Sequence, residues 1–179
     1  MYRSTRILVL GPALALPLAL RAQTADAVLL KEGASPLAAT VTFPVAKDLT
    51  YRVAWAVTTG PTTADGIAEG FRKPANFLFL ADRNGLPRTN VKLAIVVSGT
   101  ATHSLLRNEA YKAEKGADNG SIALLQALDA AGVQVIVCGE ALVKRGIAAE
   151  NLLPFVKIAP TASMALATLH AQGYATWQP

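Results

Sequence analysis

The chain has 179 residues, of which 52% are hydrophobic and 16% are charged. It is therefore long enough for one domain with a real core, and too apolar to be disordered. The formal net charge of +5 falls to +2 without the three arginines Arg3, Arg6 and Arg21 near the amino terminus. The remaining basic residues are dispersed along the chain, so there is no electrostatic case for binding nucleic acid.

Residues 1–22 have the pattern of a cleavable secretory signal peptide. Arg3 and Arg6 precede an apolar run from Ile7 to Leu20, and small residues follow, beginning with Ala22. The run is shorter than the ~20 residues that a membrane span needs, which favours cleavage after Ala22 over a permanent anchor. No later segment is long and apolar enough for a span. We therefore expect a periplasmic or otherwise secreted protein with no stable membrane anchor after cleavage.

Residues 23–50 are expected to form an irregular lead-in to the domain. Gly33, Pro36 and Pro44 interrupt this segment, and only residues 39–43 suggest a short edge strand. Regular patterns begin at Tyr51. We therefore predict a single folded domain over residues 51–179.

Four short apolar runs rich in β-branched residues predict the strands of this domain. Helical patterns lie between them, and the first of these, from Thr62 to Gly85, should be kinked or divided at Pro74. Strands that alternate with helices indicate a parallel sheet covered on both faces, which is an α/β fold. The predicted strands are residues 51–57, 92–98, 134–138 and 155–159, and the later helices are residues 104–115, 119–132, 140–145 and 161–173.

Cys138 is the only cysteine, and it ends the third predicted strand. Open α/β sheets bind ligands at the carboxyl ends of their strands, and the start of a helix favours a thiolate over a thiol. A chain with one cysteine forms no internal disulfide, which leaves a reactive thiol, an intermolecular bond or a buried inert residue. Gly139 would let a substrate approach the backbone closely.

The polar segment after the second predicted strand is the second candidate part of a site. Ser98, Gly99 and Thr100 offer hydroxyl and backbone N–H groups, and His103 adds an imidazole. In a parallel sheet this segment should lie at the same edge as Cys138. His103 then either orients a thiol or binds an anion, or is merely solvated.

Several chemistries lack their sequence motifs. There is no G-x-G-x-x-G after the first strand, no phosphate-binding G-x-x-x-x-G-K-[ST] and no G-x-S-x-G. One cysteine and two well-separated histidines do not form a zinc site within one chain, and the absence of C-x-x-C excludes a two-thiol redox cycle. We expect neither a metal nor a cofactor.

With the strands and loops placed, residues 91–174 resemble the DsrE family of sulfur-relay proteins with the DsrE/DsrF-like fold. The order and spacing of several short pieces carry the resemblance, rather than any single motif. Those pieces are Lys92–Gly99, Asn108–Tyr111, Asn119 before a helix that ends in Ala131–Val133, Val137–Leu142, Leu153–Val156, Ser163–Met164 and Gln172–Tyr174.

The resemblance implies a three-layer α/β/α sandwich with a mainly parallel sheet, and assembly into trimers or hexamers. For members with the equivalent of Cys138 it also implies a sulfur atom carried as a persulfide. Two departures stand out. Many exported relatives have His-Gly where this chain has Ser98-Gly99, and the well-understood relays are cytoplasmic.

The leading hypothesis is an exported, sulfurtransferase-like sulfur carrier with a persulfide on Cys138, served by a donor or acceptor protein or a small thiol. The alternative is a non-catalytic binding or assembly module that uses the same strand-end pocket. A third hypothesis is a redox sensor that forms an intermolecular disulfide through Cys138.

Overall fold

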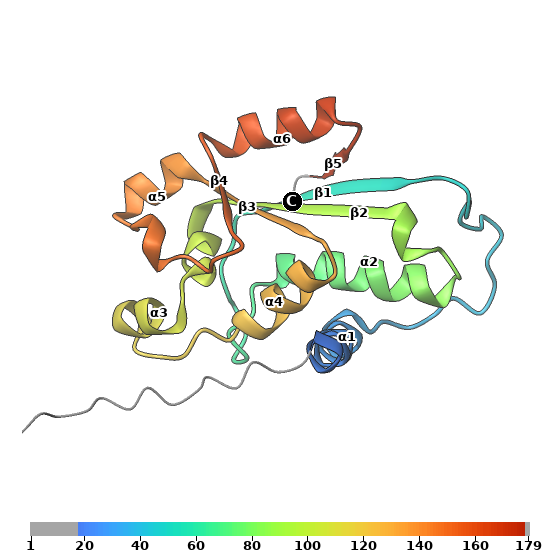
Figure 1. The fold of residues 1–179 in the computed structure, drawn as a ribbon, viewed down its shortest axis with the longest axis horizontal. Coiled ribbons are helices and arrows are strands. Elements are labelled where there is room, and N and C mark those ends of the chain that lie inside the picture. Colours follow the sequence, from blue (N-terminus) through green and yellow to red (C-terminus); the bar gives the residue numbers. More distant parts are fainter. Residues whose placement is uncertain (1–17, 178–179) are drawn as a thin grey trace, which may run out of the picture.

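The computed structural model describes residues 18–177, with side chains from Gln23 onward. Its centre is a five-stranded sheet in the order β4-β3-β2-β1-β5, and every neighbouring pair is parallel. Figure 1 shows this sheet between two sets of helices, so the α/β fold and the three layers are confirmed. The strands are β1 Tyr51–Val57, β2 Val91–Val97, β3 Gln134–Cys138, β4 Lys157–Ala159 and β5 Ala175–Trp177.

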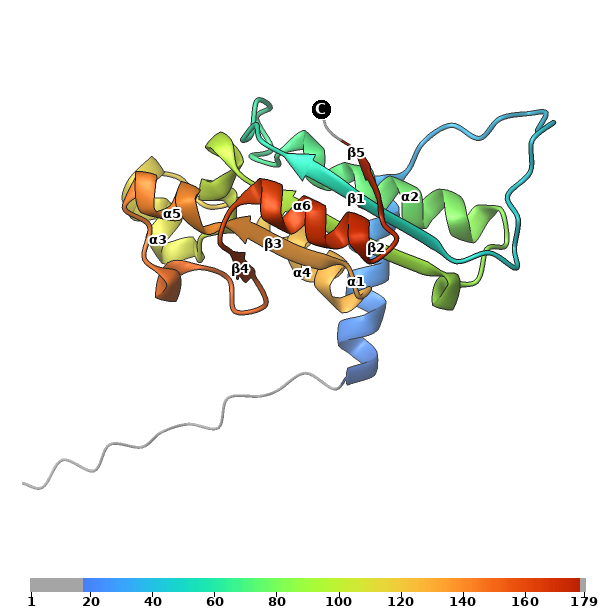
Figure 2. The same ribbon diagram turned by 90° about the horizontal axis from the view of Figure 1, so that it is seen from above.

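Helices cover the two faces of the sheet unequally. Helix α6 lies on one face, whereas α2 and α4 lie on the other with α1 behind them (Figures 1 and 2). None of the helices within residues 18–177 is long and apolar enough to cross a membrane. The α-helices are α1 Leu18–Gly33, α2 Arg72–Arg83, α3 Asn108–Lys115, α4 Ile122–Ala130, α5 Gly139–Arg145 and α6 Ala162–Ala171, and the 3-10 helices are η1 Glu69–Phe71, η2 Arg88–Asn90, η3 Gly99–Leu105 and η4 Ala149–Asn151.

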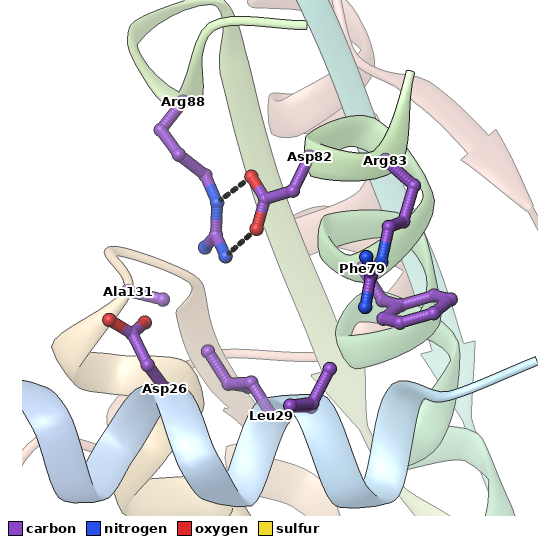
Figure 3. Close-up of a pocket in the computed structure, with 8 residues that line it drawn as sticks. Asp26, Leu29, Phe79, Asp82, Arg83, Arg88 and Ala131 are labelled. Carbon is purple, nitrogen blue, oxygen red and sulfur yellow. Dashed lines mark hydrogen bonds and ion pairs between the residues drawn. The ribbon is translucent and has the colours of Figure 1, made fainter. Parts of the chain in front are cut away.

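Helix α1 corrects the expectation that residues 23–50 are irregular throughout. Its side chain Leu29 is buried, and the Asn76 amide donates a hydrogen bond of 2.9 Å to the Gly33 carbonyl at the helix end. Figure 3 shows Asp26 and Leu29 of α1 facing a cavity of about 680 Å³ beside α2. Gly33 is the last residue of this helix, and Pro36 and Pro44 follow it, so the Ala- and Leu-rich sequence before Gly33 is free to be helical.

Four further expectations are corrected. Residues 39–43 form no strand, and the helix expected from Thr62 begins only at Arg72. Pro74 lies in the first turn of that helix, where its missing N–H breaks no helical hydrogen bond, and so it does not divide the helix. The helix expected from residue 104 begins at Asn108, after η3. The short fifth strand β5, paired with Val53–Trp55, was not predicted.

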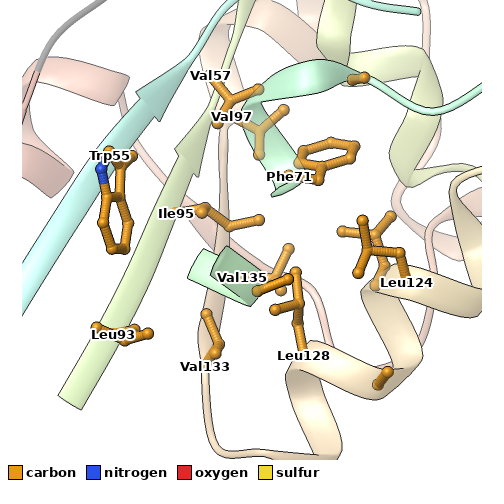
Figure 4. Packing of buried hydrophobic residues seen from close by; sticks show 14 of the residues in the cluster. Trp55, Val57, Phe71, Leu93, Ile95, Val97, Leu124, Leu128, Val133 and Val135 are labelled. Atoms are coloured by element: carbon orange, nitrogen blue, oxygen red, sulfur yellow. The ribbon is translucent and has the colours of Figure 1, made fainter. Parts of the chain in front are cut away.

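The core lies mainly between the sheet and the α2/α4 layer. Leu93, Ile95 and Val97 of β2 point into it, and Phe71 and Leu128 meet them from the helical side (Figure 4). The alternate residues of β2 point toward α6, where Ala94 and Val96 belong to a smaller cluster. Because both faces of β2 are buried, its sequence is a continuous apolar run rather than an alternating one.

Most of the expected signal peptide, residues 1–17, lies outside the described residues, and the expected cleavage point after Ala22 falls within α1.

Candidate active site at the carboxyl edge of the sheet

The register of the strands brings the two candidate segments to one edge of the sheet. Val97 of β2 is level with Val137 of β3, so Ser98 follows at the height of Cys138. On the other side, Cys138 is paired with Ala159 of β4. Cys138 and the segment after β2 therefore lie at the same carboxyl edge, which is where α/β sheets place their ligands.

Cys138 is the last residue of β3 and directly precedes α5. Its side chain is free of any disulfide and only 6% of the residue is exposed. Cys138 does not line any of four cavities, of about 230 to 840 Å³, in the described part of the chain. The thiol is thus near the edge of the sheet but largely covered.

Gly139 is required for packing within the chain. A Cβ atom there would lie 2.8 Å from the Ala159 carbonyl oxygen and 3.4 Å from both Pro160 O and Ile158 Cγ2. The next residue, Glu140, donates its backbone N–H to that Pro160 oxygen at 3.1 Å. The space that we expected a substrate to use is therefore taken by the segment after β4, which holds the start of α5 against the edge strand.

Lys144 lies on α5, the helix that follows Cys138. Its ammonium forms an ion pair of 2.7 Å with Glu140, one turn earlier on α5. This hydrogen bond and charge raise the pKa of Lys144, and the electrostatic influence of Cys138 adds to the effect. The same pair lowers the pKa of Glu140. Sequence analysis missed the pair, although the spacing of four residues on a helix is a recognisable signal.

The segment after β2 is more tightly hydrogen-bonded than its polar sequence indicates. The Thr100 hydroxyl accepts the Gly60 N–H at 2.9 Å, and the Thr102 hydroxyl donates to the Gly99 carbonyl at 2.9 Å. Gly99 has a φ of 55°, and a Cβ there would collide with the Thr58 carbonyl. Among the described residues, the Ser98 hydroxyl has no hydrogen-bond partner, so it remains available to a ligand at this edge.

His103 is turned toward α3. Its Nδ1 lies 2.9 Å from a carboxylate oxygen of Glu114, and only 16% of the imidazole is exposed. Burial raises the pKa of Glu114, but the hydrogen bond from His103, together with the charges of His103 and Lys115, outweighs burial and leaves the pKa below its ordinary value. This pair ties η3 to α3, which is a structural role for the histidine.

Asn119 holds the segments behind this edge. Its amide donates to the carbonyl oxygens of Ser104 and Leu106 at 3.0 and 2.8 Å, and its side-chain oxygen accepts the Ser121 N–H at 3.1 Å. The buried hydroxyl of Ser104 is the one side-chain polar atom in the described part of the chain that is fully enclosed without a partner. Residues 18–177 contain no cluster of three or more His, Cys, Asp or Glu side chains that could hold a metal ion.

Comparison with protein families identifies this arrangement. The model of the DsrE/DsrF-like family matches residues 52–179. The chain belongs to the DsrE/DsrF-like family. Family membership thus covers the sheet and the carboxyl edge with Cys138, whereas α1 and residues 34–50 lie before the matched region.

Two solved structures are similar to this DsrE-like chain. A protein of unknown function, MTH1491 from Methanobacterium thermoautotrophicum, is 17% identical with a TM-score of 0.47, over 72% of this chain and 99% of its own. The ychN protein from E. coli is 20% identical with a TM-score of 0.49, over 71% of this chain and 99% of its own. Comparison with curated proteins finds no match.

Proposed function

We propose that this DsrE-like protein is an exported sulfur carrier that holds sulfur as a persulfide on Cys138. Membership of the family indicates a sulfur-relay fold. The observation that carries the finer proposal is the place of Cys138, at the carboxyl edge of the sheet between the ends of β2 and β4. The only thiol of the chain stands where such sheets bind their ligands.

The proposed reaction is a transfer of sulfane sulfur. The Cys138 thiolate attacks the outer sulfur of a donor persulfide, the donor S–S bond breaks, and the donor leaves as a thiolate. The outer sulfur keeps its proton, so the product is the Cys138 persulfide and no external oxidant or reductant is needed. An acceptor thiolate takes the sulfur by the same exchange in reverse.

One neighbouring group supports this chemistry. The Ser98 hydroxyl follows β2 at the height of Cys138 and is available to donate a hydrogen bond to the persulfide. We assign His103 no part in this reaction, since its Nδ1 is engaged with Glu114.

Export and self-assembly belong to the same proposal. Cleavage after Ala22 would leave the part of α1 whose Ala25 and Val28 pack against the core, so the retained chain keeps its docked helix. Assembly into a trimer or hexamer is supported by exposed apolar side chains on three elements around the edge strand β4. These are Val143 on α5, Ile158 on β4 and Met164 on α6.

The intact mass of protein isolated without reductant tests the sulfur carrier. We expect a gain of ~32 Da that disappears on reduction, as a persulfide requires, and that is absent from Cys138→Ser. A mass that corresponds to a chain starting near Gln23 would also establish that the signal peptide is cleaved. An unmodified thiol, even after incubation with a persulfide donor, would contradict the carrier role.

A second candidate is a non-catalytic binding or assembly module, and the low exposure of Cys138 favours it. In that case Cys138 should resist alkylation by iodoacetamide in the folded protein and react only after unfolding. Rapid alkylation in the folded state would exclude this candidate. Sedimentation of the same sample measures the expected oligomer.

A further inference from the structure

A long segment before β1 borders an apolar groove at the opposite side of the sheet from β4. We call residues 34–50 the strap, and the space between the strap, α2 and β1 the strap groove. Its volume is about 840 Å³, within the range of about 300–1,000 Å³ typical of small-molecule sites. In Figure 2 the strap runs out from α1 in a wide loop and returns to β1.

The strap is anchored only at its ends. At its start, the Asn76 amide holds the Gly33 carbonyl, and near its end the Asn90 amide donates to the Lys47 carbonyl at 2.8 Å. The Ala46 N–H also donates to the Tyr51 hydroxyl at 3.0 Å. Between residues 36 and 45, no hydrogen bond joins the strap to any other described part of the chain. Hydrogen bonds therefore join the strap to the body only near its two ends.

The groove is lined mainly by aromatic and aliphatic side chains. Tyr51, Val53 and Trp55 of β1 form its floor, and Phe77 of α2 forms part of one wall, with ring contacts of 6.3 Å to Tyr51 and 6.0 Å to Trp55. On the strap, Leu37 and Val41 are more than half exposed and Phe43 is 94% exposed. Contiguous exposed apolar surface of this kind marks a binding site.

The charged residues that line the strap groove are all basic. They are Lys73 and Arg83 of α2, and no carboxylate lines it. Lys73 is exposed and has no hydrogen bond or ion pair within the described residues. Arg83 stacks over the Phe79 ring, 5.3 Å from its centroid, and no described carboxylate pairs with it. An apolar groove with unpaired positive charge is complementary to an apolar ligand with a negative end.

We propose that the strap groove binds a long-chain aliphatic carboxylate, with the hydrocarbon chain along Trp55 and Phe77 and the carboxylate beside Lys73. The site is separate from the sulfur chemistry, since none of Cys138, Ser98 and Lys144 lines it. The strap supplies part of its lining and precedes the region that the family model matches.

Binding is measured with cis-parinarate, a fluorescent fatty acid that accepts energy from tryptophan. The chain has two tryptophans, Trp55 and Trp177, and both line the groove, so bound probe should quench their emission. Saturated carboxylates of increasing length should displace the probe, each added methylene tightening binding about fourfold until the groove is filled. Methyl esters of the same length should displace it several-fold less well.

Charge reversal tests the carboxylate. Lys73→Glu should weaken carboxylate binding several-fold and leave the esters unaffected. Lys92→Glu is the matched control, because Lys92 is also exposed and unpaired but stands on β2, does not line the groove, and gives the same net charge. Equal losses in the two variants, or equal binding of acids and esters, would overturn the proposed anion.

Removal of the Phe43 ring tests whether the strap takes part in binding. Phe43→Ser should weaken probe binding at least tenfold, whereas Leu49→Ser, at an exposed apolar site of the strap that does not line the groove, should not. The rival occupants are a second copy of this chain and an apolar peptide. If Phe43→Ser abolishes assembly in sedimentation while the unsubstituted protein binds no parinarate, a second copy fills the groove and the proposal is wrong. Saturable binding of a neutral apolar peptide in place of the fatty acids would overturn it equally.

Discussion

The two faces of the sheet are packed to different depths. On the α2/α4 face, Ile95 and Val97 meet Phe71 and Leu128 in one large cluster, and α1 seals the helices from behind. On the α6 face the buried cluster is small. It consists of Ala54, Ala94, Val96, Ala165, Leu169 and Tyr174. Buried apolar area is the main source of folding free energy, so the α2/α4 face should carry most of the stability.

The α6 face leaves more apolar side chains exposed. It places α5, β4 and α6 beside Cys138 with Val143 82% exposed and Ile158 and Met164 also open to solvent. The difference is consistent with a division in which one face stabilises the domain, while the other leaves surface for the self-assembly and the sulfur chemistry that we propose. The following predictions test that division.

The largest effect should come from the core of the α2/α4 face. Phe71 is fully buried, so Phe71→Ala should lower the free energy of unfolding by about 3–5 kcal/mol. Leu169→Ala, in the small cluster under α6, should cost only about 2 kcal/mol because this cluster can collapse around the gap. Urea titration measures both. An equal loss of unfolding free energy in the two variants would contradict the conclusion that the α2/α4 face carries most of the stability.

Helix α1 provides a matched pair of adjacent leucines. Leu29 is buried against α2 and α4, while Leu30 is 50% exposed. Leu29→Ala should lower the free energy of unfolding by about 2–3 kcal/mol, whereas Leu30→Ala should change it by less than about 1 kcal/mol. Similar values by urea titration would mean that α1 is not docked in solution.

The contact between α1 and the body should respond to acid. Arg72 bridges Glu32 of α1 and Asp65, and the hydrogen bonds that Asp65 accepts from Thr63, Ile67 N–H and Arg72 lower its pKa from 3.8 to about 2. Because the folded pKa is the lower one, this stabilisation is complete above pH 3.8 and is lost as the pH falls toward 2.

Asp65→Asn should therefore lower the urea midpoint at pH 7 and flatten its decline between about pH 4 and 2. Asp48→Asn is the control, since Asp48 is exposed and makes no hydrogen bond or ion pair among the described residues. A decline as steep in Asp65→Asn as in the parent would assign the acid sensitivity to other carboxyls.

The smallest effect on stability is expected at the carboxyl edge. The pair of Lys144 and Glu140 is exposed, so Lys144→Gln should leave the urea midpoint unchanged. Lys112→Gln, which breaks a similar exposed pair with Asp118, should leave the urea midpoint equally unchanged. A lower midpoint in either variant would show that these exposed ion pairs stabilise the fold.

Local sequence was sufficient for much of the domain. β1 and β3 have the predicted bounds, and β2 is displaced by one residue, because buried parallel strands need continuous β-branched runs. The alternation of strands and helices predicted the parallel sheet, and the position of Cys138 after such a run placed it at the carboxyl edge. Family resemblance added the layer arrangement.

Contacts between distant segments decided the rest. Helix α1 is stable where it packs on α2 and α4, and β5 is only three residues long, too short for any periodicity to show. Gly139 faces the Ala159 carbonyl and His103 faces Glu114, and neither neighbour can be deduced from spacing along the chain. The sequence by itself determined which strands are buried. Only the tertiary structure decided which polar groups near Cys138 are already occupied, because hydrogen bonds and close packing depend on residues that the fold brings together.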